Sequence, residues 1–187
     1  MTAIGVLGPV PAEKIPHVFA AFRRGLAEAG YVEGKNLAIE YRFANITFTP
    51  ELMPEVAGDL VLLNRKVIFA AAPEAVAAVR NATTSIPIVA LDLESDPVAK
   101  GYVQSLARPG GNMTGTFLDI PELSGKQVGL LKEIVPRLSR VAIFGIPGLN
   151  APQFAATGTA GEIKHCKSGD CLITLTLERE AGCAATY

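Results

Sequence analysis

The sequence predicts an α/β fold built on a doubly wound, mostly parallel sheet. Short apolar runs alternate along the chain with longer stretches in which apolar residues recur at i, i+3 and i+4. One run, residues 67–71, is apolar throughout, which is typical of a central strand covered on both faces. Such alternation implies helical crossovers between parallel strands, with helices on both faces of the sheet.

The first two strand and helix pairs are delimited by turn and cap signals. Gly8-Pro9 ends the first apolar run, and Gly30 stands where a C′ glycine is expected after the first helical stripe. Thr49-Pro50 offers an N-cap followed by a proline at the first helical position. We therefore expect strands at residues 4–7 and 37–41 and helices at about residues 15–29 and 49–63.

Prolines and turns also mark the later elements. Pro73, Asp96-Pro97 and Pro121 each stand where a helix is expected to begin, and residues 108–112 form a turn cluster. Pro87 lies near the start of its apolar run, where a missing N–H matters least. The expected strands are residues 67–71, 86–91, 114–118 and 140–145, and the expected helices are residues 73–81, 96–106 and 121–135.

Composition excludes several classes of protein. The 187 residues are 49% hydrophobic and carry 17 Lys+Arg against 18 Asp+Glu, for a net charge of -1. A buried core is therefore available, while no global field favours nucleic acid or an anionic membrane. The longest apolar runs are far shorter than the roughly 20 residues that cross a bilayer. We expect neither a nucleic-acid partner nor a membrane-spanning segment.

The two ends of the chain indicate whether it carries an export signal and where disulfide bonds could form. Met1-Thr2-Ala3 leads directly into the first strand without a basic segment, a long apolar segment or a cleavage site. As written, the chain carries no export signal and would stay in the cytoplasm. All three cysteines lie after residue 165. A disulfide framework therefore does not hold residues 1–150 together, and that part depends on packing.

The candidate binding residues follow the strands, because the ligand crevice of an open α/β sheet lies beyond the carboxyl ends of its strands. The residues that we place at this rim are Gly8, Pro9, Ala72, Pro73 and Asp92. Amide groups near Pro73 to Ala75, at a helix start, would bind a ligand carboxylate, and Asp92 would face an amine. Two plainer interpretations stay open: Asp92 caps a loop or helix, and Gly8-Pro9 forms only a tight turn.

Signatures of catalysis and of cofactor binding are missing from the sequence. It contains neither the G-x-G-x-x-G of dinucleotide folds nor the G-x-x-x-x-G-K-[ST] of P-loops. His17 is alone on a predicted helix and His165 lies in the tail, so no nucleophile, base and orienting acid can be assembled. With His165, the cysteines Cys166, Cys171 and Cys183 suggest zinc but lack paired C-x2-C knuckles. We expect no enzyme activity, no cofactor and no metal.

Five stretches of the sequence form a specific set. They are residues 4–7, 29–36, 39–42, 85–89 and 96–142, the last of which contains Ser105-Leu106-Ala107-Arg108-Pro109-Gly110-Gly111-Asn112 and Glu122-Leu123-Ser124-Gly125-Lys126. Taken together, over about residues 4–150, they resemble the ABC-transporter substrate-binding family of type I periplasmic-binding fold. That family includes tryptophan- and tyrosine-uptake binding proteins.

The resemblance implies an organisation and a function. It implies a flavodoxin-like or Rossmann-like binding lobe over residues 1–118, a hinge crossing and the start of a second lobe over residues 119–150, and a tail unlike the family over residues 151–187. It also implies a periplasmic protein that binds a small, amino-acid-like solute between two lobes and delivers it to an ABC transporter permease.

The tail departs from the family pattern. Family members continue with further β-α units that complete both lobes, whereas the sequence after Asn150 shows no helix and strand rhythm beyond one strand-like alternation at residues 172–177. We therefore expect an incomplete second lobe, which a frameshifted or prematurely ended reading frame would explain. Two alternatives stay open. One is a non-functional fragment, and the other is the effector-sensing domain of a transcription regulator, although three residues before the first strand leave no room for a helix-turn-helix.

Overall fold

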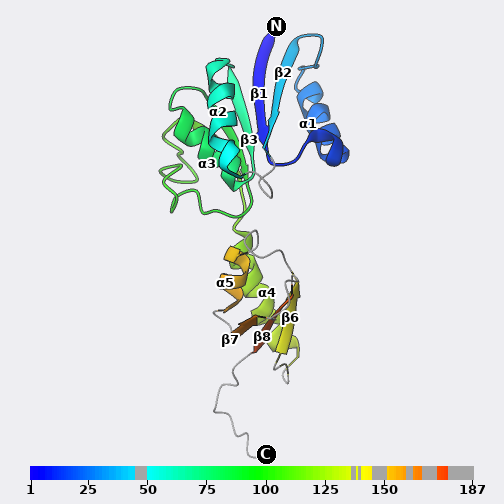
Figure 1. Cartoon of the computed structure of the whole chain (residues 1–187), viewed down its shortest axis with the longest axis vertical. Coiled ribbons are helices and arrows are strands. Elements are labelled where there is room, and N and C mark those ends of the chain that lie inside the picture. Colours follow the sequence, from blue (N-terminus) through cyan, green and yellow to red (C-terminus); the bar gives the residue numbers. More distant parts are fainter. Residues whose placement is uncertain are drawn as a thin grey trace, which may run out of the picture. The chain divides into compact units, whose positions relative to one another are not determined.

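A computed structural model describes residues 1–44, 50–135, 138, 140–144, 151–158, 162–165 and 172–176. Figure 1 shows the elements in chain order. The chain divides into two compact units, Met1–Leu118 and Asp119–Tyr187.

The first unit is built on a five-stranded parallel sheet. Its strands are β1 (Thr2–Gly8), β2 (Leu37–Phe43), β3 (Val67–Ala71), β4 (Ile88–Asp92) and β5 (Met113–Phe117). They lie in the order β2-β1-β3-β4-β5, and every neighbouring pair is parallel. The continuously apolar strand β3 is at the centre. The predicted α/β fold class with a parallel sheet is therefore confirmed.

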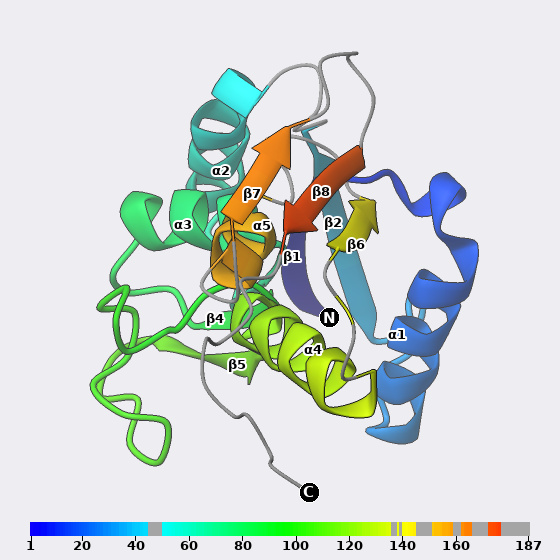
Figure 2. The same cartoon turned by 90° about the horizontal axis from the view of Figure 1, so that it is seen from below.

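Helices cover both faces of this sheet. Figures 1 and 2 show α1 (Pro16–Glu28) on one side and α2 (Met53–Leu62) and α3 (Pro73–Ala82) on the other. Two short 3-10 helices, η1 (Ala12–Lys14) and η2 (Pro50–Leu52), precede α1 and α2. Thr49, the predicted N-cap of the second helix, lies outside the described residues. The helix itself begins at Met53, after the 3-10 turn.

The two faces of the sheet are packed differently. On the α1 face the contacts are aromatic: the ring centroid of Phe19 lies 5.7 Å from that of Tyr41 and 5.8 Å from that of Phe43, and Phe22 stacks on Phe69 at 5.1 Å. The α2 and α3 face holds the main aliphatic core. Its buried members include Leu7, Leu60, Ile68, Val76, Val79, Ile88 and Met113.

The helix predicted over residues 96–106 is absent from the structure, and turns take its place. Asp96 does act as a cap, since its Oδ1 accepts from the amides of Val98 at 2.8 Å and Ala99 at 3.1 Å. Gly101 then adopts a φ of 68°, a left-handed conformation that stops helix growth. The amide of Tyr102 donates back to the carbonyl of Pro97 at 2.9 Å, which closes the turn.

The second unit contains α4 (Ile120–Ile134), β6 (Arg140–Phe144), α5 (Ala151–Gly158), β7 (Glu162–His165) and β8 (Leu172–Thr176). Its strands form an antiparallel sheet in the order β6-β8-β7. The expectation that residues after Asn150 lack helix and strand rhythm is wrong for α5 and β7. Strand β8 coincides with the alternation noted at residues 172–177. Asp119 caps α4, since its side chain accepts from the amide of Glu122 at 3.0 Å.

Among the described residues, no helix has both the length and the apolar character needed to cross a membrane. The described part of the chain also holds no group of three His, Cys, Asp or Glu side chains placed to share a metal ion. The three cysteines lie outside the described residues, although parts of the predicted tail are described.

Candidate functional site

The structure brings the five predicted site residues to one edge of the first sheet. Strands β1, β3 and β4 are neighbours and parallel, so their carboxyl ends meet. Gly8 ends β1 and Pro9 follows it, Ala72 and Pro73 follow β3, and Asp92 ends β4. The amide of Ala72 donates to the carbonyl of Leu91 at 2.9 Å, which fixes the start of α3 beside Asp92.

Ala72 holds a backbone conformation that alanine rarely adopts. Its φ is 85° and its ψ is 153°, a region that is essentially restricted to glycine and costs about 1–3 kcal/mol for other residues. Both of its backbone groups are bonded, because its carbonyl also accepts from the amide of Val76 at 3.0 Å. The strained residue therefore sets where the chain turns from strand into helix.

The amino end of α3 lacks a capping side chain, since alanine stands at the N-cap. Pro73 occupies the first position and has no N–H. The first bond of the helix is the one from Val76, so the amides of Glu74 and Ala75 precede the intrahelical ladder. A helix start of this kind attracts negative charge through its backbone dipoles.

Asp92 is fully buried, although it ends a strand beside a loop. Its Oδ1 accepts from the amides of Glu94 at 2.9 Å and Ser95 at 3.1 Å, so it does brace the loop. Its Oδ2 is buried as well and has no hydrogen-bond partner in the part of the chain that the structure describes. A buried polar atom without a partner is uncommon, because it has lost its hydration without compensation.

Tyr102 is a further residue of this neighbourhood. Burial, and after it the negative charge of Asp92, raises the pKa of its hydroxyl above the usual value of 10.0. The ring packs against the aliphatic core of the first unit. Sequence reasoning missed Tyr102 because the residue was assigned to a helix, while in the structure a turn carries it back toward the end of β4.

Gly8 helps to pair β1 with β2 at this edge. Gly8 is buried, and its carbonyl accepts from the amide of Ala44 at 3.1 Å, which extends the pairing of β1 with β2. A Cβ on Gly8 would lie 4.0 Å from the Cβ of Ala71 and 3.9 Å from the ring of Phe43, so the position is not crowded.

The two histidines lie in different units, His17 in α1 and His165 in β7.

Comparison with known proteins assigns a family to this fold. The family model described as ABC transporter substrate binding protein matches residues 3–165. The chain belongs to this family. The match extends beyond Asn150 and includes α5 and β7.

A tyrosine-binding protein and a domain solved with L-Trp are similar to this chain. The chain is 30% identical over 142 residues to the tyrosine-binding protein of Clostridioides difficile strain R20291, an alignment that covers 75% of this chain and 39% of that protein. A solved Streptococcus pneumoniae ABC domain in complex with L-Trp matches with a TM-score of 0.61 and 25% identity, over 74% of this chain and 45% of its own.

Two further solved structures have the same fold. One is a conserved domain protein from Vibrio cholerae, with a TM-score of 0.62 and 31% identity over 74% of this chain and 45% of that chain. The other is a ligand-free, open substrate-binding protein with adhesive properties from Clostridium difficile, with a TM-score of 0.60 and 27% identity over 85% of this chain and 53% of that chain. The chain thus spans about two fifths to one half of the length of these relatives.

Proposed function

We propose that this chain binds an amino acid, or a similar small solute, at the carboxyl edge of the first sheet, as the solute-binding component of an ABC importer. The observation that supports this most directly is the buried, unpartnered Oδ2 of Asp92. An ammonium group would donate a hydrogen bond to this oxygen and carries the charge opposite to that of the carboxylate. The start of α3, with the amides of Glu74 and Ala75, would hold the carboxylate of the same ligand.

An aromatic amino acid is the first candidate solute. Tyr102 is half-buried and lies close enough to Asp92 for that charge to raise its pKa, so we expect its ring to contact the aromatic side chain of a ligand held at Asp92. The relatives named for tyrosine and crystallised with L-Trp favour the same class. Because Asp92 is fully buried, its loop must shift before the ligand can reach Oδ2.

The wider role follows the family. We propose that residues 1–118 form the first solute-binding lobe and that residues 119–150 make the crossing and begin a second lobe. The described elements after Asn150 belong to the same unit as this second lobe, since β8 pairs with β6. In this role the protein acts outside the cytoplasmic membrane, closes on its solute and passes it to a permease. Gly8 and Pro9 would shape the rim, while Ala72 and Pro73 present the start of α3.

Calorimetric titration of the full chain with L-tyrosine, L-tryptophan and the other amino acids tests the ligand site. We expect at least one to bind, and Asp92→Asn to weaken that binding roughly tenfold or more, because a charge-assisted hydrogen bond is lost. Asparagine keeps the Oδ1 that accepts from Glu94 and Ser95, so the loop remains braced.

Asp96→Asn is the matched control for this experiment. Asp96 lies in the same loop and also accepts two amides through Oδ1, but it is exposed. We expect its substitution to leave amino-acid affinity unchanged. The ligand assignment is wrong if no amino acid binds, or if Asp92→Asn folds and binds as tightly as the unmodified chain.

A further inference from the structure

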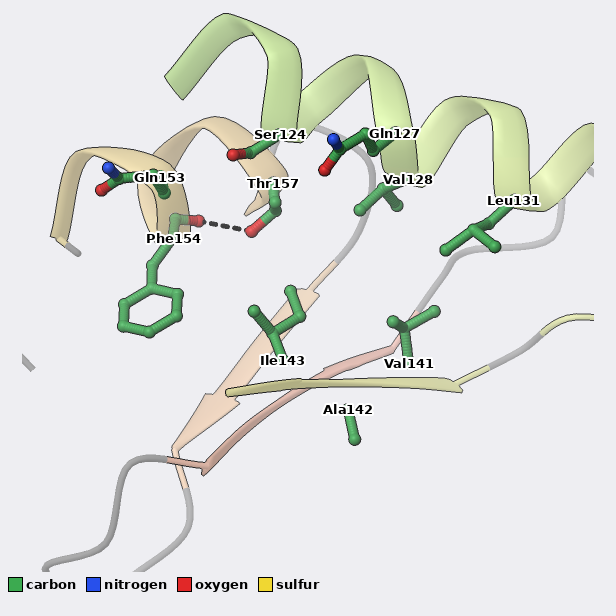
Figure 3. A pocket seen from close by; sticks show the side chains of 10 residues that line it. All are labelled: Ser124, Gln127, Val128, Leu131, Val141, Ala142, Ile143, Gln153, Phe154 and Thr157. Atoms are coloured by element: carbon green, nitrogen blue, oxygen red, sulfur yellow. Dashed lines mark hydrogen bonds between the residues drawn. The ribbon is translucent and has the colours of Figure 1, made fainter. Parts of the chain in front are cut away.

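The second unit contains a pocket that the proposed amino-acid site does not use. It has a volume of about 410 Å³ and lies between α4, α5 and β6 (Figure 3). Ligand pockets commonly measure roughly 300–1,000 Å³, so this volume suits a molecule of one or two rings. We propose that it binds a small, uncharged, mostly apolar molecule with one hydrogen-bond donor, such as a phenol or an indole.

The wall of the pocket is mainly apolar. Val128 of α4 is buried and packs against Val141 and Ile143 of β6. Leu131 of α4 and the buried Phe154 of α5 also line the space. Aliphatic and aromatic walls favour an apolar ligand, because removing its apolar surface from water stabilises the bound state.

Helices α4 and α5 approach each other closely beside the pocket. Gly125 faces α5, and a Cβ built on it would lie 3.1 Å from the carbonyl oxygen of Ala156. Glycine therefore allows this close approach of α4 and α5, which holds Ser124 and Thr157 at the top of the same space (Figure 3).

The polar groups of the pocket offer acceptors. Ser124 donates its hydroxyl hydrogen to the carbonyl of Ile120 at 2.9 Å, and Thr157 donates its own to the carbonyl of Phe154 at 2.8 Å. Each hydroxyl has one hydrogen, so both oxygens are left with accepting lone pairs. The Oε1 of Gln153 is buried and has no donor among the residues that the structure describes. Because this atom is closed to solvent, the Gln153 side chain must turn toward the space before a ligand that donates one hydrogen bond can satisfy it.

Charge separates this pocket from the proposed amino-acid site. None of the 10 lining residues in the described part of the chain is Asp, Glu, Lys, Arg or His. A zwitterion would lose the hydration of both charges without gaining a counter-charge, which is strongly unfavourable. The pocket therefore favours a neutral molecule, and its occupancy does not depend on Asp92.

Phenol and toluene are matched probes, since they differ by a hydroxyl in place of a methyl. Titration of the methyl-labelled full chain, followed by NMR, should show saturable shifts for the methyl groups of Val128 and Ile143 with both probes. Burying the hydroxyl of phenol without a partner is unfavourable, whereas toluene has no hydroxyl to satisfy. We therefore expect Gln153→Met, which removes the acceptor and keeps the length, to lower the phenol-to-toluene affinity ratio about tenfold.

Gln104→Met is the control, because Gln104 is exposed, lies in the first unit and does not line the pocket. This variant should keep the affinity ratio of the unmodified chain. Ile143→Phe, which fills the space, should abolish the shifts and serves if Gln153→Met does not fold. The proposal is overturned if the ratio is unchanged in folded Gln153→Met, if neither probe shifts Val128 and Ile143, or if Ile143→Phe binds normally.

Discussion

At the scale of single residues, the candidate site contains a strained backbone conformation and a buried oxygen that lacks a hydrogen bond. Ala72 holds a glycine conformation, and the Oδ2 of Asp92 is buried without a partner in the described chain. Each state costs free energy, so the surrounding fold must impose it. Their position at the carboxyl ends of adjacent strands is where ligands bind in open α/β sheets. Local strain and strand topology therefore indicate the same place.

Replacing Ala72 with glycine tests the strain directly. Glycine adopts a φ of 85° without a Cβ penalty, so we expect Ala72→Gly to raise the free energy of unfolding by about 1 kcal/mol, net of its entropic cost. Ala78→Gly, inside α3, should instead lower it by about 1 kcal/mol. Urea denaturation followed by circular dichroism measures both, and destabilisation by Ala72→Gly would contradict the backbone assignment.

The hydroxyl of Tyr102 reports the charge of Asp92. Burial and Asp92 both raise its pKa above 10.0, so Asp92→Asn should shift the pKa downward while leaving part of the effect of burial. Ultraviolet titration of tyrosinate, compared with a Tyr102→Phe variant, resolves this group. Asp96→Asn should leave the titration unchanged.

The same pKa shift sets a pH dependence of stability. A group whose pKa is raised by folding stabilises the fold fully below its unfolded pKa, and this contribution is lost as the pH rises through the folded pKa. The fold should therefore lose stability above about pH 10, and Tyr102→Phe should weaken that loss. Urea midpoints measured across this range, on both chains, test the expectation. Equal pH profiles for the two chains would contradict it.

At the scale of elements, the interface between β1 and α2 depends on a matched pair. A Cβ on Gly5 would lie 2.9 Å from a methyl of the fully buried Leu60, so the glycine makes room for the leucine. We expect Leu60→Ala to cost about 2–5 kcal/mol and Gly5→Ala to cost about 1–3 kcal/mol. The double variant should cost less than the sum, because the cavity accepts the added methyl. Additive costs in urea denaturation would show that the two sites are independent.

The sequence predicted those elements whose signals are local, and it missed those that depend on contacts between distant segments. Strands β1 to β6 and helices α1 to α4 were expected because apolar periodicity is a local property that their burial preserves. Asp96-Pro97 gave the same local signal as a helix start, but Gly101 and the turn through Tyr102 end it. Helix α5 was missed because it is short and packs on α4 across Gly125, a contact that no local pattern contains.

The candidate site was predicted only in part for the same reason. Strand ends can be read from turn residues, so Gly8, Pro9, Ala72, Pro73 and Asp92 could be placed at one edge. The φ of Ala72, the burial of Asp92 and the approach of Tyr102 arise from tertiary packing. Sequence therefore located the edge, and the structure adds which atoms there lack partners.

At the scale of the whole molecule, the first unit contains the elements of its own core. Its five strands are paired within residues 1–118, and among the described residues the main buried cluster draws on none beyond Met113 and its partly buried neighbour Phe117. We therefore predict that a fragment ending at Leu118 folds alone. Its backbone amide NMR spectrum should overlay the peaks of the same residues in the full chain.

A fragment ending at Asp92 provides the contrast. It keeps β1 to β4 but loses β5, which pairs with β4 from Ile88↔Met113 to Asp92↔Phe117, and it loses the core residue Met113. The carbonyl of Asp92 would also lose the amide of Leu118, which donates to it at 3.1 Å. This shorter fragment should give the narrow amide dispersion of an unfolded chain. If both fragments fold equally well, β5 is dispensable; if the longer fragment is also unfolded, the first unit depends on the second for its stability.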